Sequence, residues 1–153
     1  MTKQTPRDSA LGFLNRRPSS AKAYVLGLPE LFRHNPHFDE RDRSFITNLV
    51  QGVWRWQLKL DWIIEQYSRF PLTRIDSQTL DILRLATYQI VFLDRVPDSA
   101  AVNEAVEQAK KKCPRHVVSF VNAILRRISS QKENYPALNR EEETGRDFRP
   151  ATE

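Results

Sequence analysis

Apolar side chains recur every three or four residues along most of this 153-residue chain, and this spacing most limits its fold. Residues three or four apart lie on one face of an α-helix, whereas a half-buried strand alternates apolar and polar residues. The clearest such run is Phe45, Ile46, Leu49, Val50 and Val53. Almost every periodic stretch has helical spacing, so the sequence predicts an all-α fold, a compact bundle of about seven helices.

Capping residues and prolines mark where these helices begin. The expected starts are, in chain order, Thr5–Pro6, Ser19 or Ser20, Asp39, a position near Asp61, Asp76 or Ser77, the Val96–Ser99 turn, and the residues after Pro114. The fifth segment is apolar almost without interruption between Leu80 and Phe92. A helix that is apolar on most of its circumference is buried, so this one is expected at the centre of the core.

The charges divide the chain into two parts. Residues 1–132 carry 21 basic and 13 acidic side chains, whereas residues 133–153 carry 3 basic and 6 acidic ones. The apolar period also stops at Gln131, which predicts a helical domain over 1–130 and an acidic linker or tail over 131–153. The basic body favours a polyanionic partner, nucleic acid before membrane, because Lys and Arg release counterions when they meet phosphates.

Several function classes find no support in the residues. There is no apolar stretch of membrane-spanning length and no signal-peptide pattern, so we expect a cytoplasmic protein without membrane contact. The four glycines form neither GxGxxG nor a P-loop, which argues against a nucleotide cofactor. Pro36 breaks helical presentation of His34 and His37, so no metal site is expected. The single cysteine, Cys113, cannot form an internal disulfide.

Three blocks of residues, taken together, resemble the NusB-like family over roughly residues 6–130. The blocks are Asp42–Phe45 running through Leu49-Val50-Gln51-Gly52-Val53-Trp54-Arg55 to Leu60-Asp61-Trp62; Leu83-Arg84-Leu85-Ala86-Thr87-Tyr88-Gln89; and Asp94-Arg95-Val96-Pro97 with Ala101-Val102-Asn103-Glu104-Ala105-Val106-Glu107 and Phe120-Val121-Asn122-Ala123-Ile124-Leu125-Arg126-Arg127. The resemblance implies an all-helical RNA-binding domain.

This family has two known settings. One is the free antitermination factor NusB, which binds box A RNA with a ribosomal-protein partner. The other is the N-terminal domain of ribosomal RNA cytosine-C5 methyltransferases of the RsmB/Sun type, to which this chain is more similar at Leu60-Asp61-Trp62, at the Asp94–Pro97 turn and at Arg126-Arg127. The resemblance therefore implies a non-catalytic domain that acts on ribosomal RNA. Antitermination is the first alternative.

In the methyltransferases, a Pro-Cys cysteine and a glycine-rich S-adenosylmethionine site lie in a further C-terminal domain. Neither pattern is present here: Cys113-Pro114 has the reversed order, and there is no glycine-rich loop. We therefore assign this chain no catalytic residue and no cofactor. The absent catalytic domain would be its partner in cis. A second alternative is a structural module that packs on that domain through its tryptophans and touches no RNA.

Lys110, Lys111, Lys112 and Arg115 concentrate positive charge at the end of the sixth helix. Cations there also cap a helix by opposing the negative end of its dipole, so capping and phosphate binding both account for them. The family resemblance adds basic residues of the N-terminal part. The complete set of candidate RNA-binding residues is Arg7, Arg16, Arg17, Lys110, Lys111, Lys112, Arg115, Arg126 and Arg127.

Other polar and aromatic residues are interpreted as structural. Trp54, Trp56 and Trp62 can stack on bases, but their helical spacing favours packing in the core or at a domain interface. Asn103 and Asn122 lie within apolar blocks and are expected to tie helix ends or loops by hydrogen bonds. Arg84 is expected to form an ion pair with Glu104 that fixes helix register.

Overall fold

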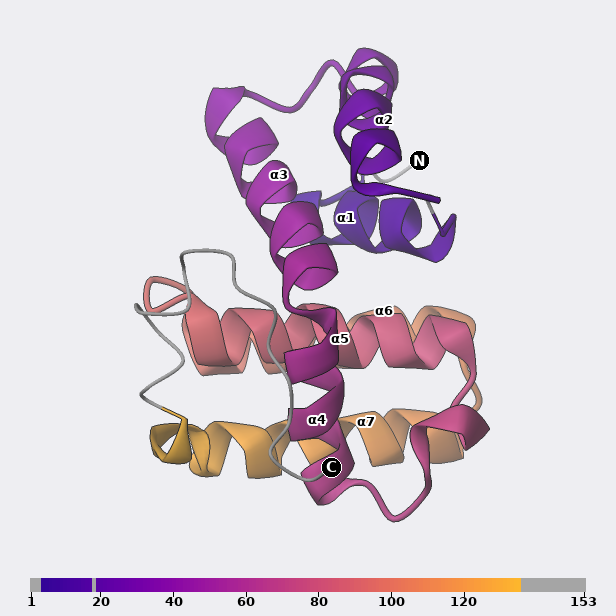
Figure 1. Cartoon of the computed structure of the whole chain (residues 1–153), viewed down its shortest axis with the longest axis vertical. Helices are drawn as coiled ribbons and strands as arrows, with labels where there is room; N and C mark the ends of the chain where they lie inside the picture. The colour runs from indigo at the N-terminus through magenta and orange to yellow at the C-terminus, as the bar shows by residue number, and fades with distance from the viewer. Residues whose placement is uncertain (1–3, 18, 136–153) are drawn as a thin grey trace.

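The computed structural model describes residues 4–17 and 19–135. Seven α-helices and two 3₁₀ turns follow one another along the chain (Figure 1). They are α1 (Pro6–Asn15), α2 (Ala21–His34), α3 (Glu40–Arg55), α4 (Gln57–Tyr67), η1 (Leu72–Arg74), α5 (Ser77–Phe92), α6 (Asp98–Lys112), α7 (Arg115–Ser130) and η2 (Lys132–Asn134). The described residues contain no strand, so the all-α, seven-helix prediction is confirmed.

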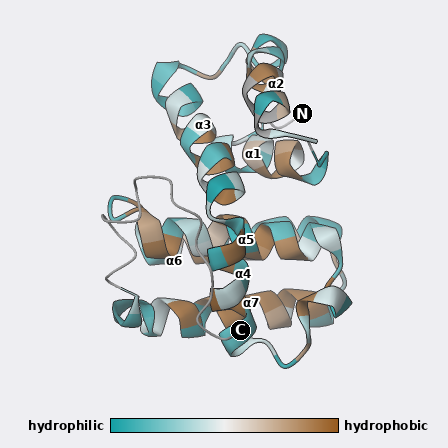
Figure 2. Cartoon of the chain, in the orientation of Figure 1, coloured by the Kyte–Doolittle hydropathy of each residue, from teal (hydrophilic) through white to brown (hydrophobic). Residues whose placement is uncertain are grey.

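The α5 helix lies at the centre of this bundle. It contacts α1 and α3 in the upper part of Figure 1 and α4, α6 and α7 in the lower part, where α4 crosses the other three. Every α5 residue from Thr79 to Val91 is buried, as the uninterrupted apolar run predicts. The outer helices are instead amphipathic, and Figure 2 shows hydrophobic and hydrophilic bands alternating along α3 and α7.

Four of the helix starts are capped by the residues that the sequence indicates. Thr5, Ser20, Asp39 and Asp76 each accept a hydrogen bond from the backbone N–H three residues later. The expected start of α4 near Asp61 is wrong, because this helix begins at Gln57. Trp56 is the C-cap residue of α3 and also the N-cap residue of α4, so the two helices join without a loop.

A buried ionic network ties α4 and α1 to α5. The Arg84 guanidinium donates two hydrogen bonds to the Asp61 carboxylate, at 2.7 and 2.9 Å, and one to Asp81 at 3.2 Å. Burial lowers the pKa of Arg84, but the hydrogen bonds and charges of both aspartates outweigh it and leave that pKa raised. Arg17, at the end of α1, also contacts Asp81 at 3.1 Å.

The expected ion pair between Arg84 and Glu104 is therefore wrong. Glu104 instead accepts a hydrogen bond from the Thr5 hydroxyl at 3.1 Å, which links α6 to the start of α1. Arg84 does form an ion pair with a carboxylate, as expected, but the partners are Asp61 and Asp81. The sequence does not say which neighbouring helix supplies such a partner.

Only residues 131–135 of the expected 131–153 tail are described, and they lie against the helical body. The Tyr135 hydroxyl is 3.0 Å from the Tyr67 hydroxyl, and its ring meets the Trp62 ring edge-on. Burial raises the pKa of Tyr135, as does the hydrogen bond with Tyr67. The remainder of that expected segment, residues 136–153, lies outside the described residues.

Gly52 lets α3 approach the ring of Tyr88 closely. A Cβ at position 52 would overlap that ring, whereas a Cβ at Gly12, inside α1, would meet nothing within 4 Å. Gly52→Ala is therefore expected to lower the free energy of unfolding by about 1–3 kcal/mol through overpacking. Gly12→Ala is expected to raise it by about 0.5–1 kcal/mol, because alanine loses less backbone entropy in a helix. Urea unfolding followed by circular dichroism measures both, and equal effects would contradict this explanation.

Removing the Arg84 guanidinium should lower the free energy of unfolding far more than breaking a surface ion pair does. Arg84→Met removes two hydrogen bonds from the Asp61 carboxylate and leaves Asp81, which is 1% exposed, with the contact to Arg17. Loss of one member of a buried pair typically costs about 3–5 kcal/mol. Glu107→Gln breaks the exposed pair with Lys110 (3.0 Å) and should cost less than about 1 kcal/mol. A urea-unfolding comparison in which both variants lose similar stability would refute this role for Arg84.

Candidate nucleic-acid interface

Four helix ends meet on the right-hand side of the molecule as drawn in Figure 1: the end of α1, the start of α5, the end of α6 and the start of α7. Arg17 donates to the Ser77 carbonyl at 3.1 Å, which brings α1 to the start of α5. The Thr79 hydroxyl is 3.7 Å from the Cys113 sulfur, which brings the start of α5 to the end of α6. Cys113 is half-buried in this joint.

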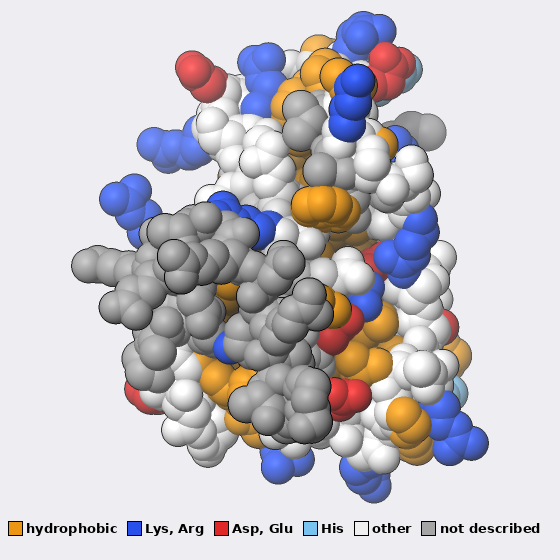
Figure 3. Space-filling view, in the orientation of Figure 1, with side chains coloured by type: hydrophobic (Ala, Val, Ile, Leu, Met, Phe, Trp, Pro, Cys, Tyr) orange, Lys and Arg blue, Asp and Glu red, His pale blue; other side chains and the backbone are white. Residues whose placement is uncertain are grey.

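Six of the nine predicted RNA-binding residues lie on these helix ends, which we call the basic end. Its residues are Arg16, Arg17, Lys110, Lys111, Lys112 and Arg115. Figure 3 shows Lys and Arg side chains along the same right-hand edge. The structure thus brings together two basic runs that are about ninety positions apart in the sequence.

Half of these cations are already paired. Lys110 contacts Glu107 at 3.0 Å, Lys111 contacts Asp8 at 3.4 Å, and Arg17 contacts Asp81 at 3.1 Å. Arg16, Lys112 and Arg115 are exposed, and none of them contacts a carboxylate in the described part of the chain. Cations without a carboxylate partner give the strongest attraction for phosphate groups.

The other three candidates lie elsewhere. Arg7 is half-buried, donates to the Gln89 side chain at 2.7 Å and lies over the Phe45 ring, so it holds α1 against α3 and α5. Arg126 and Arg127 lie about 17 Å along α7 from Arg115. Arg126 donates to the Asn122 side chain at 3.1 Å, and Arg127 lies over the Tyr67 ring. The structure does not bring these three to the basic end.

An apolar groove of about 880 Å³ adjoins the basic end between the end of α4, η1 and α7. Phe70, which is 46% exposed, packs beside Phe120 with the ring centres 5.8 Å apart. Three arginines and a histidine also line this α4–α7 groove; they are Arg69, Arg74, Arg127 and His116. Cations around exposed aromatic rings are suited to phosphates and unstacked bases.

Sequence reasoning missed most of this groove because its residues come from three separate segments. Arg69, Phe70 and Arg74 lie in the connection between α4 and α5, where helical periodicity gives no information. The available signal was the neighbouring pair Arg69-Phe70, a cation beside an aromatic residue in a predicted loop.

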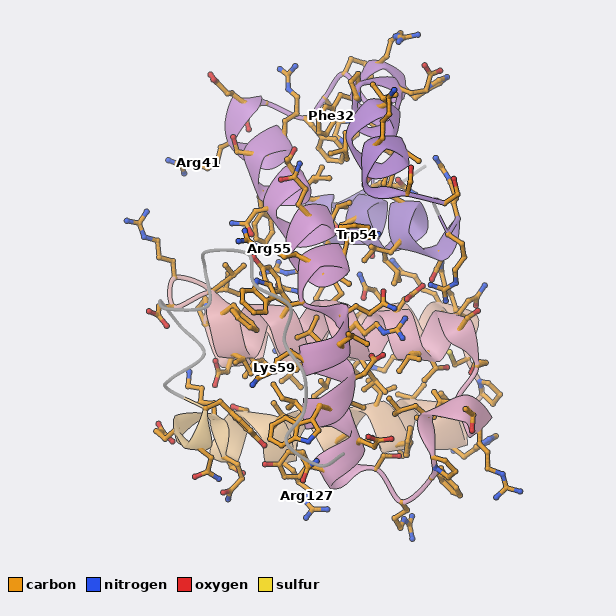
Figure 4. The ribbon with its side chains drawn as sticks, viewed as in Figure 1. Phe32, Arg41, Trp54, Arg55, Lys59 and Arg127 are labelled. Carbon is orange, nitrogen blue, oxygen red and sulfur yellow. The ribbon has the colours of Figure 1, made fainter. Side chains whose placement is uncertain are left out.

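The three tryptophans differ in their surroundings. Trp56 is buried, and Trp62 packs against the core beside Tyr135 and Lys59. The packing interpretation is confirmed for these two. Trp54 is 42% exposed and lies to the right of α3 in Figure 4.

The expected roles of the two asparagines are wrong. Asn103 is exposed, and Asn122 is hydrogen-bonded to Arg126 one turn further along the same helix, so its bond ties no helix end or loop. Both lie on α-helical faces that an amide can occupy without being buried.

Residues 4–17 and 19–135 contain neither a metal-binding cluster nor a membrane-spanning helix. No three His, Cys, Asp or Glu side chains there are grouped closely enough to hold a metal ion. The ring nitrogens of His34 and His37 lie near different carbonyls, those of Glu30 (2.9 Å) and Gln4 (3.1 Å). None of the helices in those residues combines the length and apolar character needed to cross a membrane.

Two kinds of curated relative match the chain. A probable ribosomal RNA small subunit methyltransferase B from Bacillus subtilis is 33% identical over 139 residues, which is 91% of this chain and 30% of the relative. A transcription antitermination protein NusB from Acetivibrio thermocellus is 40% identical over 95 residues, or 61% of this chain and 66% of the relative. The chain thus spans less than two thirds of either relative. A second probable methyltransferase B, from Synechocystis, is 41% identical over 92 residues, 60% of this chain and 21% of that protein.

The fold agrees with this grouping. The solved structure of T. maritima NusB superimposes with a TM-score of 0.67 at 22% identity and covers 85% of this chain and 94% of that one. The family model of NusB matches residues 5–130, which correspond to the whole seven-helix bundle. The chain therefore belongs to the NusB family.

Proposed function

We propose that this domain is non-catalytic and binds RNA through the basic end. The observation that carries the proposal is the convergence of Arg16, Lys112 and Arg115 on one end of the bundle without carboxylate partners among the described residues. Contacts of this kind bind the phosphate backbone and fix the orientation of a protein on folded RNA, while carrying little sequence information. The exposed Phe70 ring in the α4–α7 groove beside them can pack against a nucleotide of that folded RNA.

More specifically, we propose that the domain is the N-terminal part of a cytoplasmic ribosomal RNA cytosine-C5 methyltransferase. The similarity to the Bacillus subtilis methyltransferase extends over 91% of this chain, whereas that to the Acetivibrio NusB protein extends over 61%. In this proposal the domain holds ribosomal RNA. Methyl transfer and S-adenosylmethionine belong to a catalytic domain in cis.

A free antitermination factor is the second candidate, and the 40% identity to the Acetivibrio NusB protein favours it. Such a factor would bind box A RNA with a ribosomal-protein partner. The gene distinguishes the two candidates. A reading frame that continues beyond codon 153 into a glycine-rich methyltransferase domain supports the first and eliminates the second.

A third candidate is a module that packs on the catalytic domain without touching RNA. The exposed Trp54 favours it, because large exposed apolar side chains often mark protein contacts. This candidate differs from the others in a measurable way. It predicts that substitutions at the basic end leave the RNA affinity unchanged.

The double substitution Lys112→Gln and Arg115→Gln tests the role of the basic end. Binding of the chain to fragments of small-subunit ribosomal RNA, with tRNA as competitor, is measured from about 50 to about 200 mM salt. The variant is expected to bind at least about tenfold more weakly at the lowest salt. The slope of log K against log salt should become shallower by about 1.5–2, because two phosphate contacts are lost.

The matched control is Lys112→Arg with Arg115→Lys, which keeps both charges and should retain the affinity within a few fold. Equal affinity and slope for the wild type and the charge-removing variant would overturn the proposal. The proposal would also be overturned if the wild type bound every RNA weakly, with an affinity that does not change with salt. That result would favour the third candidate.

A further inference from the structure

A second groove lies between α3 and the C-terminal end of α5, and the function proposed above does not use it. Its volume is about 890 Å³, and we call it the α3–α5 groove. Because α5 is 16 residues long, this groove lies roughly 20 Å from the basic end, which is at the other end of α5. Most of its lining residues are polar side chains of α3, and α5 closes the groove with Tyr88 and Phe92.

One wall of the groove is a polar stripe along α3. Ser44, Asn48, Gln51 and Arg55 recur at a spacing of three or four and so lie on one face of the helix. The Asn48 side-chain oxygen accepts a hydrogen bond from the Tyr88 hydroxyl, which directs this amide and leaves its NH₂ group as a donor. Ser44 and Gln51 are exposed. The stripe therefore offers hydroxyl and amide groups to a ligand.

The opposite side of the groove is aromatic. The rings of Tyr88, Phe92 and Trp56 form a stack, with centroid distances of 5.4 Å between Tyr88 and Phe92 and 5.1 Å between Phe92 and Trp56. Gly52 permits this arrangement, since any larger residue would occupy the space of the Tyr88 ring. Phe92, in the middle of the stack, is only half-buried.

Arginines border the groove along the length of α3. Arg43 and Arg55 line it, and Figure 4 shows Arg41 and Arg55 on the same side of α3, opposite Trp54. Two carboxylates nearby form a capping box. The Asp39 carboxylate accepts a hydrogen bond from the backbone N–H of Asp42, and the Asp42 carboxylate accepts one from the backbone N–H of Asp39. No ion pair joins Arg41 or Arg43 to these aspartates or to Glu40 in the described part of the chain. Arg43 Nε donates to the Asp39 carbonyl at 3.4 Å, so its terminal nitrogens and the Arg41 guanidinium remain able to meet a phosphate.

We infer that the α3–α5 groove binds an unpaired RNA strand. Guanidinium groups suit the phosphates, amides suit the hydrogen-bonding edges of bases, and the half-buried edge of the Phe92 ring gives a base an apolar contact. Arg41 and Arg55 are separated by about 21 Å along α3, which corresponds to about six stacked nucleotides at 3.4 Å each. A protein partner would instead seek apolar pockets for its anchoring side chains, and this lining is mostly polar.

This inference rests on the proposed function, because both concern RNA, but it uses other residues. Folded RNA would lie on the basic end, and an adjoining unpaired stretch would enter the groove at the far end of α5. The domain would then recognise a junction between paired and unpaired RNA. Neither site alone distinguishes such a junction from a plain helix or a plain strand.

The test uses two RNA probes and two variants of the chain. The probes are a single-stranded hexanucleotide of mixed sequence and a blunt hairpin from small-subunit ribosomal RNA. The groove variant is Arg41→Gln with Arg43→Gln and Gln51→Ala, three exposed residues outside the core. The second variant is Lys112→Gln with Arg115→Gln. Circular dichroism and urea unfolding verify that each variant is folded.

The groove variant is expected to bind the hexanucleotide at least about tenfold more weakly and the hairpin within about twofold of wild type. The slope of log K against log salt for the hexanucleotide should become shallower by about 1.4, as expected for two phosphate contacts on a single strand. The basic-end variant should show the reverse pattern. Arg41→Lys with Arg43→Lys keeps the charge and should retain most of the hexanucleotide affinity.

The outcomes separate this inference from the proposed function. If the groove variant binds the hexanucleotide as wild type does, or if the wild type binds only the hairpin, the inference fails and the proposed function stands. If the groove variant loses affinity for both probes equally, a separate site for the unpaired strand is refuted. If the wild type binds neither probe, both ideas fail.

Discussion

The arrangement of the other helices depends on the ionic network around the Arg84 guanidinium. Arg84 is 7% exposed and lies within α5, so its charge is stable there only because the carboxylates of Asp61 and Asp81 accept its hydrogen bonds. Asp61 belongs to α4 and Asp81 to α5, so the network fixes where α4 crosses the central helix. Apolar packing tolerates small shifts between helices, whereas bidentate hydrogen bonds do not.

The same network extends to the candidate RNA surface. Arg17 ends α1 with a φ of 57°, a left-handed backbone that typically costs a non-glycine residue about 1–2 kcal/mol. Its contacts with Asp81 and the Ser77 carbonyl help to offset this cost. Arg17 is thus used to close the bundle, while its neighbour Arg16 contacts no carboxylate in the described part of the chain. Two adjacent arginines therefore have different roles, one structural and one proposed for RNA.

The sequence predicted the features that depend on local chemistry. A hydroxyl or carboxylate at Thr5, Asp39 or Asp76 can cap a helix wherever that helix lies, so these starts were readable. The central place of α5 followed from its apolar circumference. The start of α4 was not readable, because Trp56 carries no capping side chain and ends one helix while beginning the next.

Features that depend on distant neighbours were harder to predict. Arg7 carries the same charge as Arg16, yet it lies against Gln89, 82 positions away, and is half-buried. Charge runs predicted the basic residues, but only the fold shows that α1, α6 and α7 present six of them together. Both grooves combine residues from separate elements, and helical periodicity contains no information about such combinations.

The direct joint at Trp56 limits how the length of this chain can vary. One residue inserted there would rotate α4 by about 100° and carry Leu60, Ile63 and Ile64 away from the core. The turn of the chain between α2 and α3, or between α4 and α5, can absorb an added residue at the cost of loop entropy alone. Insertions and deletions are therefore expected in those loops, while the spacing between α3 and α4 stays constant.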